Sequence, residues 1–319
     1  MATKDRRAAE RPGAALPTMG AMAATDDLRY MPRLGLALGG GGALGAAHVG
    51  VLQVLHERGI VPSIITGTSA GSIAGGAYAL GIDPYDLADR VVHWSWSTFG
   101  RWTPRPGLGI LTADALLDGL AEVTGGDPQI EDLPTRFAAV ATDVNTREAV
   151  VLDHGSLSLA VAASIAVPGV FRPVPHQGRH LLDGGLVQNL PLEACFGLGA
   201  EHVIGVRLQP EWDFPGFEST VRVHEWEIRA DVTVIAPRLV GHTAWEVKDL
   251  AALVQLGREA AEEEFDDYPV INARPPHPTA DDHHIGRLID PQPPAAAEAT
   301  EGADEPERPH GIAGFLHRH

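Results

Sequence analysis

Apolar side chains along this chain occur in two patterns, short continuous runs and longer stretches with helical spacing. The continuous runs predict buried strands, and they cover residues 33–38, 63–66, 137–141, 202–208 and 231–236. Stretches with apolar residues three and four positions apart predict helices, one ending near Gly59 and others at residues 70–80, 157–166, 190–196 and 244–265. Because such alternation is typical of a mostly parallel sheet covered by helices on both sides, we predict an α/β sandwich in one domain.

The two ends of the chain lack these patterns. Residues 1–32 mix Ala, Pro, Gly and charged side chains without an apolar period, and residues 270–319 contain eight prolines. Proline interrupts both helices and strand pairing. We therefore predict a flexible N-terminal extension at 1–32, a folded domain at 33–269 and a disordered, Pro-rich and acidic tail at 270–319.

Composition adds size and charge to this picture. Of the 319 residues 44% are hydrophobic, which is enough for a large core, and the formal net charge is −18. The two ends carry +1 and −4, so the predicted domain carries −15. Nucleic-acid binding requires clustered Lys and Arg, whereas the only lysines are Lys4 and Lys248. We therefore predict no nucleic-acid partner.

The same features bear on the cellular compartment. A single cysteine, Cys195, excludes a disulfide framework. The sequence contains no apolar run of about 18 residues that would predict a spanning helix, and its first residues contain no apolar signal core. We expect a cytoplasmic protein without stable membrane insertion, which is repelled by anionic lipid and meets a lipid interface only transiently.

A glycine-rich loop follows the first predicted strand, where residues 39–45 read GGGGALG. Glycines allow a tight turn there and leave backbone N–H groups at the start of a helix, which suits an anion. The spacing of Gly40, Gly42 and Gly45 also fits a dinucleotide-binding turn. That site requires an acidic residue after the second strand, where this chain has Ile65-Thr66-Gly67. A turn that uses glycine only for its geometry is the other alternative.

A second motif, Gly67-Thr68-Ser69-Ala70-Gly71, lies between a predicted strand and a predicted helix. It matches G-x-S-x-G, the pattern of a nucleophile elbow, in which small neighbours let a serine project its hydroxyl from a strained turn. We predict that Ser69 is a nucleophile. A serine that merely starts a helix is the alternative, and Ser72 fits that description equally well.

A nucleophilic serine needs a base. Histidine is the usual one, but nothing in the sequence around His48, His176 or His180 distinguishes them from packed or surface histidines. Asp183 ends a short apolar run and is followed by two glycines, which offers a carboxylate instead, although Asp-Gly is also ordinary turn chemistry. The run Asp281-Asp282-His283-His284 falls in the predicted tail and indicates solvated charge, so we predict no metal and no cofactor.

The order of the motifs, G-x-G-x-x-G, then G-x-S-x-G, then D-G-G at 183–185, resembles the patatin-like phospholipase family, lipid acyl hydrolases that use a Ser–Asp dyad. The likeness extends to residues 163–171 (ASIAVPGVF), to Asn189-Leu190-Pro191 and to the 230–237 strand followed by a long helix, and it covers about residues 33–265. It implies a three-layer α/β/α sandwich with a mostly parallel central sheet. It also implies hydrolysis of acyl esters or lipids, of phospholipase A, lysophospholipase or carboxylesterase type.

Carried over residue by residue, the resemblance implies Ser69 as nucleophile and Asp183 as its proton acceptor, acting through an acyl-enzyme. The backbone N–H groups of Gly40, Gly41 and Gly42 would form the oxyanion hole. The other glycines of the three motifs are Gly45, Gly67, Gly71, Gly184 and Gly185.

One position departs from the family pattern, because Leu44 stands where the family usually carries Arg or Lys. Recognition of a phosphate head group is therefore less strongly implied than ester hydrolysis, and segment 209–226 is short for the region that shapes the acyl site in some relatives. A catalytically weak regulatory or ligand-binding protein on the same fold is the alternative function. One aromatic group could contact an acyl chain or pack in the core, namely Trp94, Trp96, Phe99 and Trp102.

Overall fold

The computed structural model describes residues 33–93, 101–102, 109–112, 126–208, 225–226 and 228–268. All of the described residues belong to one unit, which lies within residues 1–274. The predicted N-terminal extension and tail lie outside the described residues. So do Trp94, Trp96, Phe99, the side chain of Trp102 and nearly all of segment 209–226.

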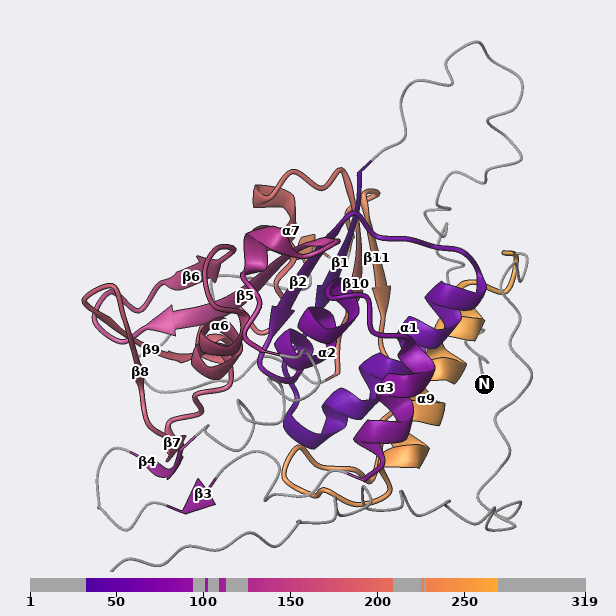
Figure 1. Ribbon diagram of the computed structural model, residues 1–319. Coiled ribbons are helices and arrows are strands. Elements are labelled where there is room, and N and C mark those ends of the chain that lie inside the picture. The colour runs from indigo at the N-terminus through magenta and orange to yellow at the C-terminus, as the bar shows by residue number, and fades with distance from the viewer. Residues whose placement is uncertain are drawn as a thin grey trace, which may run out of the picture. The chain divides into compact units, whose positions relative to one another are not determined.

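A mixed sheet forms the centre of the described part (Figure 1). Its eight strands are β1 (Leu34–Leu38), β2 (Ile64–Thr68), β5 (Arg136–Asp143), β6 (Ala149–Leu152), β8 (Val174–His176), β9 (Arg179–Asp183), β10 (His202–Val206) and β11 (Val232–Ile235). The strand order is β11-β10-β1-β2-β5-β9-β8, with β6 paired to β5. The first five strands in this order are parallel, whereas β6, β8 and β9 pair antiparallel. The prediction of a mostly parallel sheet is confirmed.

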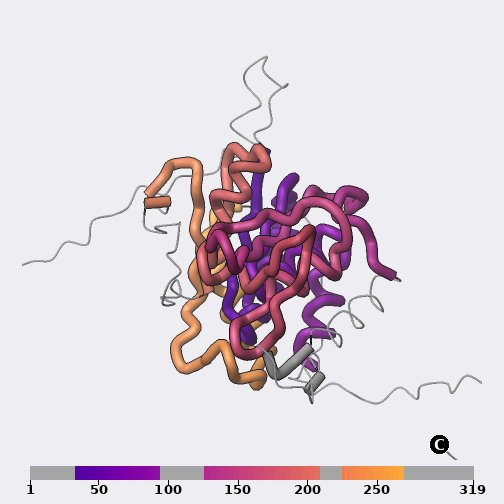
Figure 2. The backbone as a smooth tube through the Cα atoms, turned by 90° about the vertical axis from the view of Figure 1, so that its left-hand side faces the viewer, coloured from indigo at the N-terminus to yellow at the C-terminus, as the bar shows by residue number. Residues whose placement is uncertain are grey.

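Helices cover both faces of this sheet, but unequally (Figure 1 and Figure 2). The described α-helices are α1 (Ala46–Glu57), α2 (Ala70–Ala79), α3 (Pro84–Val91), α6 (Leu157–Ser164), α7 (Leu192–Gly197) and α9 (Leu250–Glu264). Leu36 and Leu38 of β1 belong to the large core shared with α1, α2, α3, α6 and α9. Ala37 between them belongs to a smaller core with Cys195 of α7. Alternate strand residues thus serve opposite faces, and the predicted α/β/α sandwich is confirmed.

Helices α1 and α9 approach closely where each carries a glycine. A Cβ atom on Gly50 would lie 1.9 Å from the carbonyl oxygen of Val254, and one on Gly257 would lie 1.9 Å from that of Ala47. Near the end of α1, Arg258 donates two hydrogen bonds to the carboxylate of Glu57, at 2.8 and 2.7 Å. Backbone contact and a mostly buried ion pair therefore join two helices that are about 200 residues apart in sequence.

Several short elements were not predicted, because they are too short to leave a clear hydropathy period. A second sheet of described residues joins β3 (Arg101–Trp102), β4 (Gly109–Thr112) and β7 (Gly169–Phe171). Three 3₁₀ turns also occur: η2 (Gly42–Gly45), η3 (Ile130–Asp132) and η4 (Gly184–Leu186). Two of these turns lie in the glycine-rich motifs at 39–45 and 183–185.

One predicted helix was wrong at its start. The pattern predicted a helix from residue 244, but α9 begins at Leu250, after Asp249 in a left-handed conformation with φ 53°. The carbonyl oxygen of Ala244 accepts a hydrogen bond from the N–H of Ala43 at 2.9 Å, so this backbone pairs with the glycine loop and not within a helix. The other predicted strands and helices have ends within two residues of those observed.

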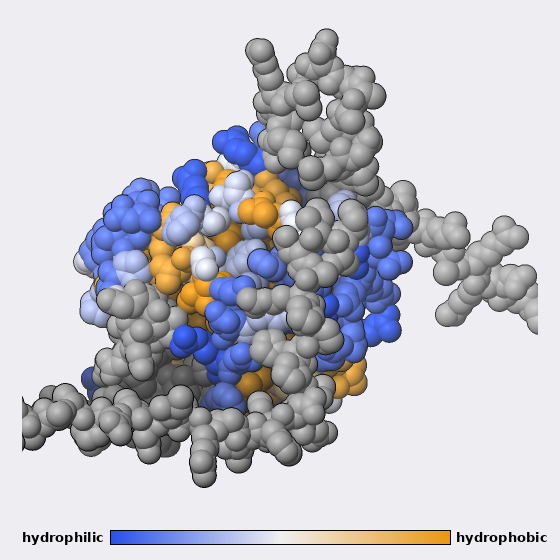
Figure 3. Space-filling view, turned by 45° about the vertical axis from the view of Figure 1, so that its right-hand side comes forward, coloured by the Kyte–Doolittle hydropathy of each residue, from blue (hydrophilic) through white to orange (hydrophobic). Residues whose placement is uncertain are grey.

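Acidic side chains account for much of the polar surface of α9, where Glu259, Glu263 and Glu264 are exposed. Hydrophilic residues cover much of the described surface in Figure 3, with hydrophobic patches between them. Among the described residues, no helix combines the length and the hydropathy that crossing a bilayer requires.

Candidate active site

Two strands meet end to end at the centre of the site. Strand β2 pairs in parallel with β5 as far as Thr68 opposite Val140, and β9 pairs antiparallel with β5 from its last residue, Asp183, opposite Ala141. Because these positions are consecutive on β5, the carboxyl ends of β2 and β9 face each other. Ser69 directly follows β2, and its Oγ donates a hydrogen bond to Oδ2 of Asp183 at 2.7 Å.

Ser69 occupies a strained turn between β2 and α2, with φ 52° and ψ −122°. A positive φ is uncommon for a residue with a side chain, so the surrounding contacts must hold it. The Ser69 N–H donates to Oγ of Ser164 at 2.8 Å, and that hydroxyl donates to the carbonyl of Val140 at 2.7 Å. The Ser72 hydroxyl donates to the Ser69 carbonyl at 2.7 Å. These contacts direct the Ser69 side chain towards Asp183.

The motif glycines lie where side chains would not fit. A Cβ atom on Gly71 would be 2.1 Å from the Leu38 carbonyl oxygen, and one on Gly67 would be 2.4 Å from the Gly71 carbonyl oxygen. The same holds at Gly45 against the side chain of Ala70, at Gly184 against backbone and, less tightly, at Gly185 against Asp183. Close approach of backbone segments thus accounts for these residues.

Asp183 is fully buried, and both oxygens of its carboxylate accept hydrogen bonds. Oδ2 accepts from Ser69, and Oδ1 accepts from the N–H of Gly185 at 2.7 Å. Burial raises the pKa of Asp183 to about 6, because removal from water disfavours the charged form, although these two hydrogen bonds lower it in part. The carboxylate is therefore ionised at neutral pH yet more basic than an ordinary aspartate.

The glycine loop has most of its backbone N–H groups engaged. The N–H of Gly39 donates to Val206, that of Gly40 to Asn189 and that of Ala43 to Ala244, at 3.0, 3.0 and 2.9 Å. Within the described part of the chain, no hydrogen bond uses the N–H of Gly41 or Gly42. The N–H of Gly40 is therefore occupied, contrary to the prediction that it contributes to an oxyanion hole, and those of Gly41 and Gly42 remain available.

Leu44 is buried in the large core with 5% of its surface exposed. Its N–H donates to the carbonyl of Gly41 at 3.1 Å, inside the turn η2. The position that usually carries a cation in the family is therefore an apolar packing position here.

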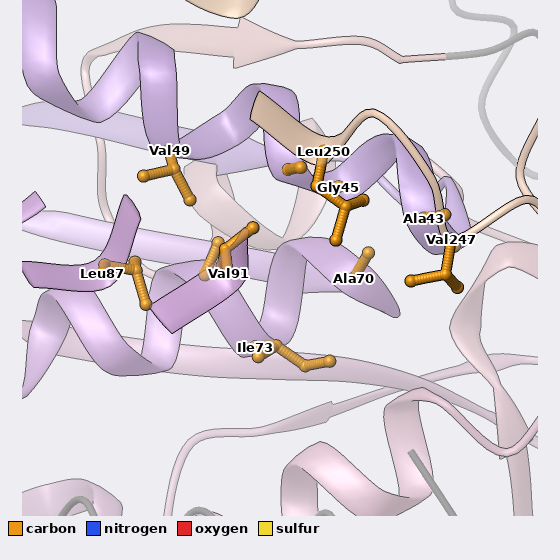
Figure 4. Close-up of a pocket in the computed structure, with 12 residues that line it drawn as sticks. Ala43, Gly45, Val49, Ala70, Ile73, Leu87, Val91, Val247 and Leu250 are labelled. Carbon is orange, nitrogen blue, oxygen red and sulfur yellow. The ribbon is translucent and has the colours of Figure 1, made fainter. Parts of the chain in front are cut away.

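An apolar pocket opens beside Ser69. It encloses about 560 Å³ of empty space, including its mouth, and is lined by Gly42, Ala43, Ser69, Ala70, Ile73, Ile165, Val167, Phe171, Ala244, Trp245 and Val247. A second apolar pocket, which encloses about 430 Å³ of empty space including its mouth, adjoins it, because both share Gly42, Ala43, Ala70, Ile73 and Val247. Figure 4 shows the second pocket between α1, α2, α3 and the start of α9, with Leu87 and Val91 on the α3 side.

The histidines considered from the sequence lie away from Ser69 in the hydrogen-bond pattern of the described residues. His48 is buried and donates to the Gly39 carbonyl, His176 is half-buried and His180 is exposed. Among the hydrogen bonds of the described residues, none joins a histidine to Ser69. The described residues also contain no group of three His, Cys, Asp or Glu side chains arranged to hold a metal ion. The run at residues 281–284 lies outside the described residues.

Two residues of the site were missed from the sequence. Ser164 holds the backbone of Ser69, and the carbonyl of Asn189 holds Gly40. Both lie in the segments that carry the family resemblance, but a serine near a helix end and an Asn-Leu-Pro turn have no pattern that predicts these contacts.

The fold and this arrangement define a class of proteins: α/β sandwiches with a serine at a strand-to-helix elbow, hydrogen-bonded to a buried aspartate. A model of the family described as patatin-like phospholipase matches residues 36–196. The chain belongs to this family, as the sequence motifs indicated.

Known relatives resemble this chain over about half of its length. An uncharacterized NTE family protein of Mycobacterium tuberculosis is 41% identical over 183 residues, which cover 56% of this chain and 49% of that protein. A lysophospholipase, nte1, of Aspergillus fumigatus is 35% identical over 178 residues, 54% of this chain and 12% of that protein. The aligned region therefore spans about half of the mycobacterial protein. Among solved structures, VipD from Legionella pneumophila is 17% identical with a TM-score of 0.47, over 75% of this chain and 67% of that one.

Proposed function

We propose that the protein is a serine-dependent lipid acyl hydrolase, of phospholipase A, lysophospholipase or carboxylesterase type, in which Ser69 is the nucleophile and Asp183 the proton acceptor. The observation that carries this proposal is the 2.7 Å hydrogen bond from Ser69 Oγ to the buried Asp183 carboxylate, beside an apolar pocket. Family membership supports the reaction class.

In the first half of the reaction, Oγ of Ser69 attacks the ester carbonyl carbon while its proton passes to Oδ2 of Asp183. The pKa of about 6 places this carboxylate in the ionised form at neutral pH with raised basicity, as a general base requires. The oxyanion that forms is stabilised by the N–H groups of Gly41 and Gly42, which have no acceptor among the described residues. Asp183 then protonates the departing alcohol, and an acyl-enzyme remains on Ser69.

In the second half, water replaces the alcohol. Asp183 takes a proton from the water, whose oxygen attacks the acyl carbon, and the same N–H groups stabilise the second oxyanion. The C–O bond to Ser69 then breaks, Ser69 Oγ regains its proton from Asp183, and a carboxylic acid is released. These steps require only groups of this chain and water.

The pockets favour substrates with an apolar acyl chain. The walls around Ser69 and the adjoining pocket are formed almost wholly by aliphatic and aromatic side chains, among them Ile73, Phe171 and Val247. Leu44 supplies no cation for a phosphate group. We therefore propose that recognition rests on the acyl chain and the ester more than on a charged head group.

We also propose domain bounds, a cellular compartment and the absence of one class of partner. We place the hydrolase domain at residues 33–269 and the protein in the cytoplasm, without a nucleic-acid partner. The acidic net charge and the small number of lysines support the last of these assignments.

An activity-based probe tests the proposal directly. A fluorophosphonate should label the wild-type protein and the Ser72→Ala variant but not Ser69→Ala, because Ser69 is the serine at the elbow and its hydroxyl is hydrogen-bonded to the Asp183 carboxylate. Turnover of p-nitrophenyl esters, lysophospholipids and diacylphospholipids should fall about 10³-fold or more in Asp183→Asn. A folded wild-type protein that is neither labelled nor active on any of these esters would refute the proposal and favour a ligand-binding role.

A further inference from the structure

His48 lies in the first turns of α1 and is fully buried. Its Nε2 is 2.7 Å from the carbonyl oxygen of Gly39. Since a carbonyl oxygen only accepts hydrogen bonds, Nε2 must carry the hydrogen, and Nδ1 is then the bare nitrogen of a neutral ring. Burial lowers the pKa of His48 to about 4, with the hydrogen bond to Gly39 opposing, so the ring is neutral at neutral pH.

Nδ1 of His48 has no hydrogen-bond partner among the described residues. A buried polar atom without a partner destabilises the folded state, and an aliphatic side chain at this position would avoid that cost. The packing of the core therefore does not explain why an imidazole stands at position 48. The hydrogen bond from Nε2 to the Gly39 carbonyl, the one polar contact of this ring in the described structure, does explain it.

That contact acts on one peptide group, the one that joins Gly39 to Gly40. Its carbonyl oxygen is held by His48, and its N–H is held by the carbonyl of Asn189 at 3.0 Å. Both polar atoms are thus restrained from opposite sides, which fixes the plane of the peptide. The next two N–H groups along the chain are those of Gly41 and Gly42.

We propose that His48 is a positioning residue, whose hydrogen bond to the Gly39 carbonyl orients the glycine loop so that the N–H groups of Gly41 and Gly42 point at the developing oxyanion. The inference rests on the proposed function. Within the described structure, the other hydrogen bonds of residues 39–43 join backbone groups to backbone groups. The hydrogen bond from His48 is therefore one that a side-chain substitution can remove.

Two variants of similar size separate the hydrogen bond from the bulk of the ring. His48→Met fills the space without a donor, whereas His48→Gln places an amide N–H where Nε2 stands. In ester hydrolysis we expect His48→Met to lower kcat by about 10- to 100-fold with KM within about twofold, because an oxyanion donor acts on the transition state. His48→Gln should recover most of kcat. Thermal unfolding of each variant shows whether it is folded under the assay conditions.

A folded His48→Met variant that retains kcat, or equal loss of kcat in folded Met and Gln variants, would overturn the role of His48. If neither variant folds, ¹⁵N chemical shifts of the wild-type protein decide: a ring protonated on Nε2 at pH 7 is expected, and the Nδ1–H tautomer, which cannot donate from Nε2 to the Gly39 carbonyl, refutes the proposal. Failure of the proposed function and failure of the proposed role of His48 give different results. A wild-type protein without esterase activity refutes the proposed function, whereas an active wild type with an equally active His48→Met refutes only this inference.

Discussion

The most informative perturbation of the elbow is Ser164→Ala. The Ser164 hydroxyl is fully buried and lies between two backbone groups, accepting from the N–H of Ser69 at 2.8 Å and donating to the carbonyl of Val140 at 2.7 Å. Alanine removes both contacts without changing the helix. The N–H of Ser69 then has no acceptor among the described residues, at a residue whose φ of 52° already strains the backbone.

The expected cost follows from these contacts. A buried donor left without a partner costs about 1–3 kcal/mol, and the lost hydrogen bond to Val140 about 0.5–1.5 kcal/mol. The free energy of unfolding should therefore fall by roughly 2–4 kcal/mol. For a domain of this size each kcal/mol shifts Tm by about 2–4 °C, so Tm should fall by about 5–15 °C. The Ser69 hydroxyl is also less firmly directed at Asp183, so kcat should fall about tenfold or more.

Ser72→Ala is the matched control. The Ser72 hydroxyl is equally buried and also contacts the backbone of Ser69, donating to its carbonyl at 2.7 Å. That carbonyl keeps the N–H of Ser72 at 2.8 Å after the substitution, so no group is left without a partner and the cost should be about 1 kcal/mol. Urea unfolding and steady-state kinetics on one ester compare the two variants. Equal destabilisation by both, or a loss below 1 kcal/mol for Ser164→Ala, would refute the reasoning.

Three further predictions follow from the same contacts. Because Asp183 must be ionised to accept a proton and its pKa is about 6, kcat/KM should rise with pH through about 6 and level above it; a profile flat from pH 5 to 8 contradicts this role. Leu87→Trp should narrow the second pocket and lower kcat/KM about tenfold for long-chain p-nitrophenyl esters with little change for the acetate; a uniform loss excludes an acyl site there. Arg258→Met should lower the free energy of unfolding by about 1–3 kcal/mol at pH 7, because it leaves the mostly buried Glu57 without its cation. Burial by itself raises the pKa of Glu57, but the hydrogen bonds from Arg258 and Tyr85 outweigh it and hold this pKa below its ordinary value. The difference in unfolding free energy between wild type and Arg258→Met should therefore shrink as pH falls through the pKa of Glu57. A difference that grows in acid would contradict this prediction.

The sheet and its elbow could be predicted from local pattern. Continuous apolar runs belong to strands buried on both faces, and the strands at 34–38, 64–68 and 202–206 were found from these runs. Glycines around Ser69 indicated a tight strand-to-helix turn, and the structure has it. Such features depend on neighbouring residues alone, so one sequence suffices.

The helix predicted from residue 244 shows where local pattern fails. Residues 244–249 continue the apolar spacing of α9, yet the Ala244 carbonyl pairs with the N–H of Ala43, about 200 residues earlier. The oxyanion-hole role predicted for the Gly40 N–H fails for the same reason, because this N–H donates to the carbonyl of Asn189. In both cases a distant backbone group competes for a hydrogen bond, and sequence spacing does not report that competition.

The sequence by itself determined the order of most strands and helices along the chain, the glycine turns and which serine and aspartate we propose as the reactive pair, because hydropathy period, turn geometry and motif order are local properties. Only the tertiary structure decided that β2 and β9 end against each other on β5, which brings Ser69 Oγ to 2.7 Å from the Asp183 carboxylate. It also decided which N–H groups of the glycine loop remain available and how basic Asp183 is. These properties arise from burial and from hydrogen bonds between residues more than a hundred positions apart, which exist only once the sheet has formed.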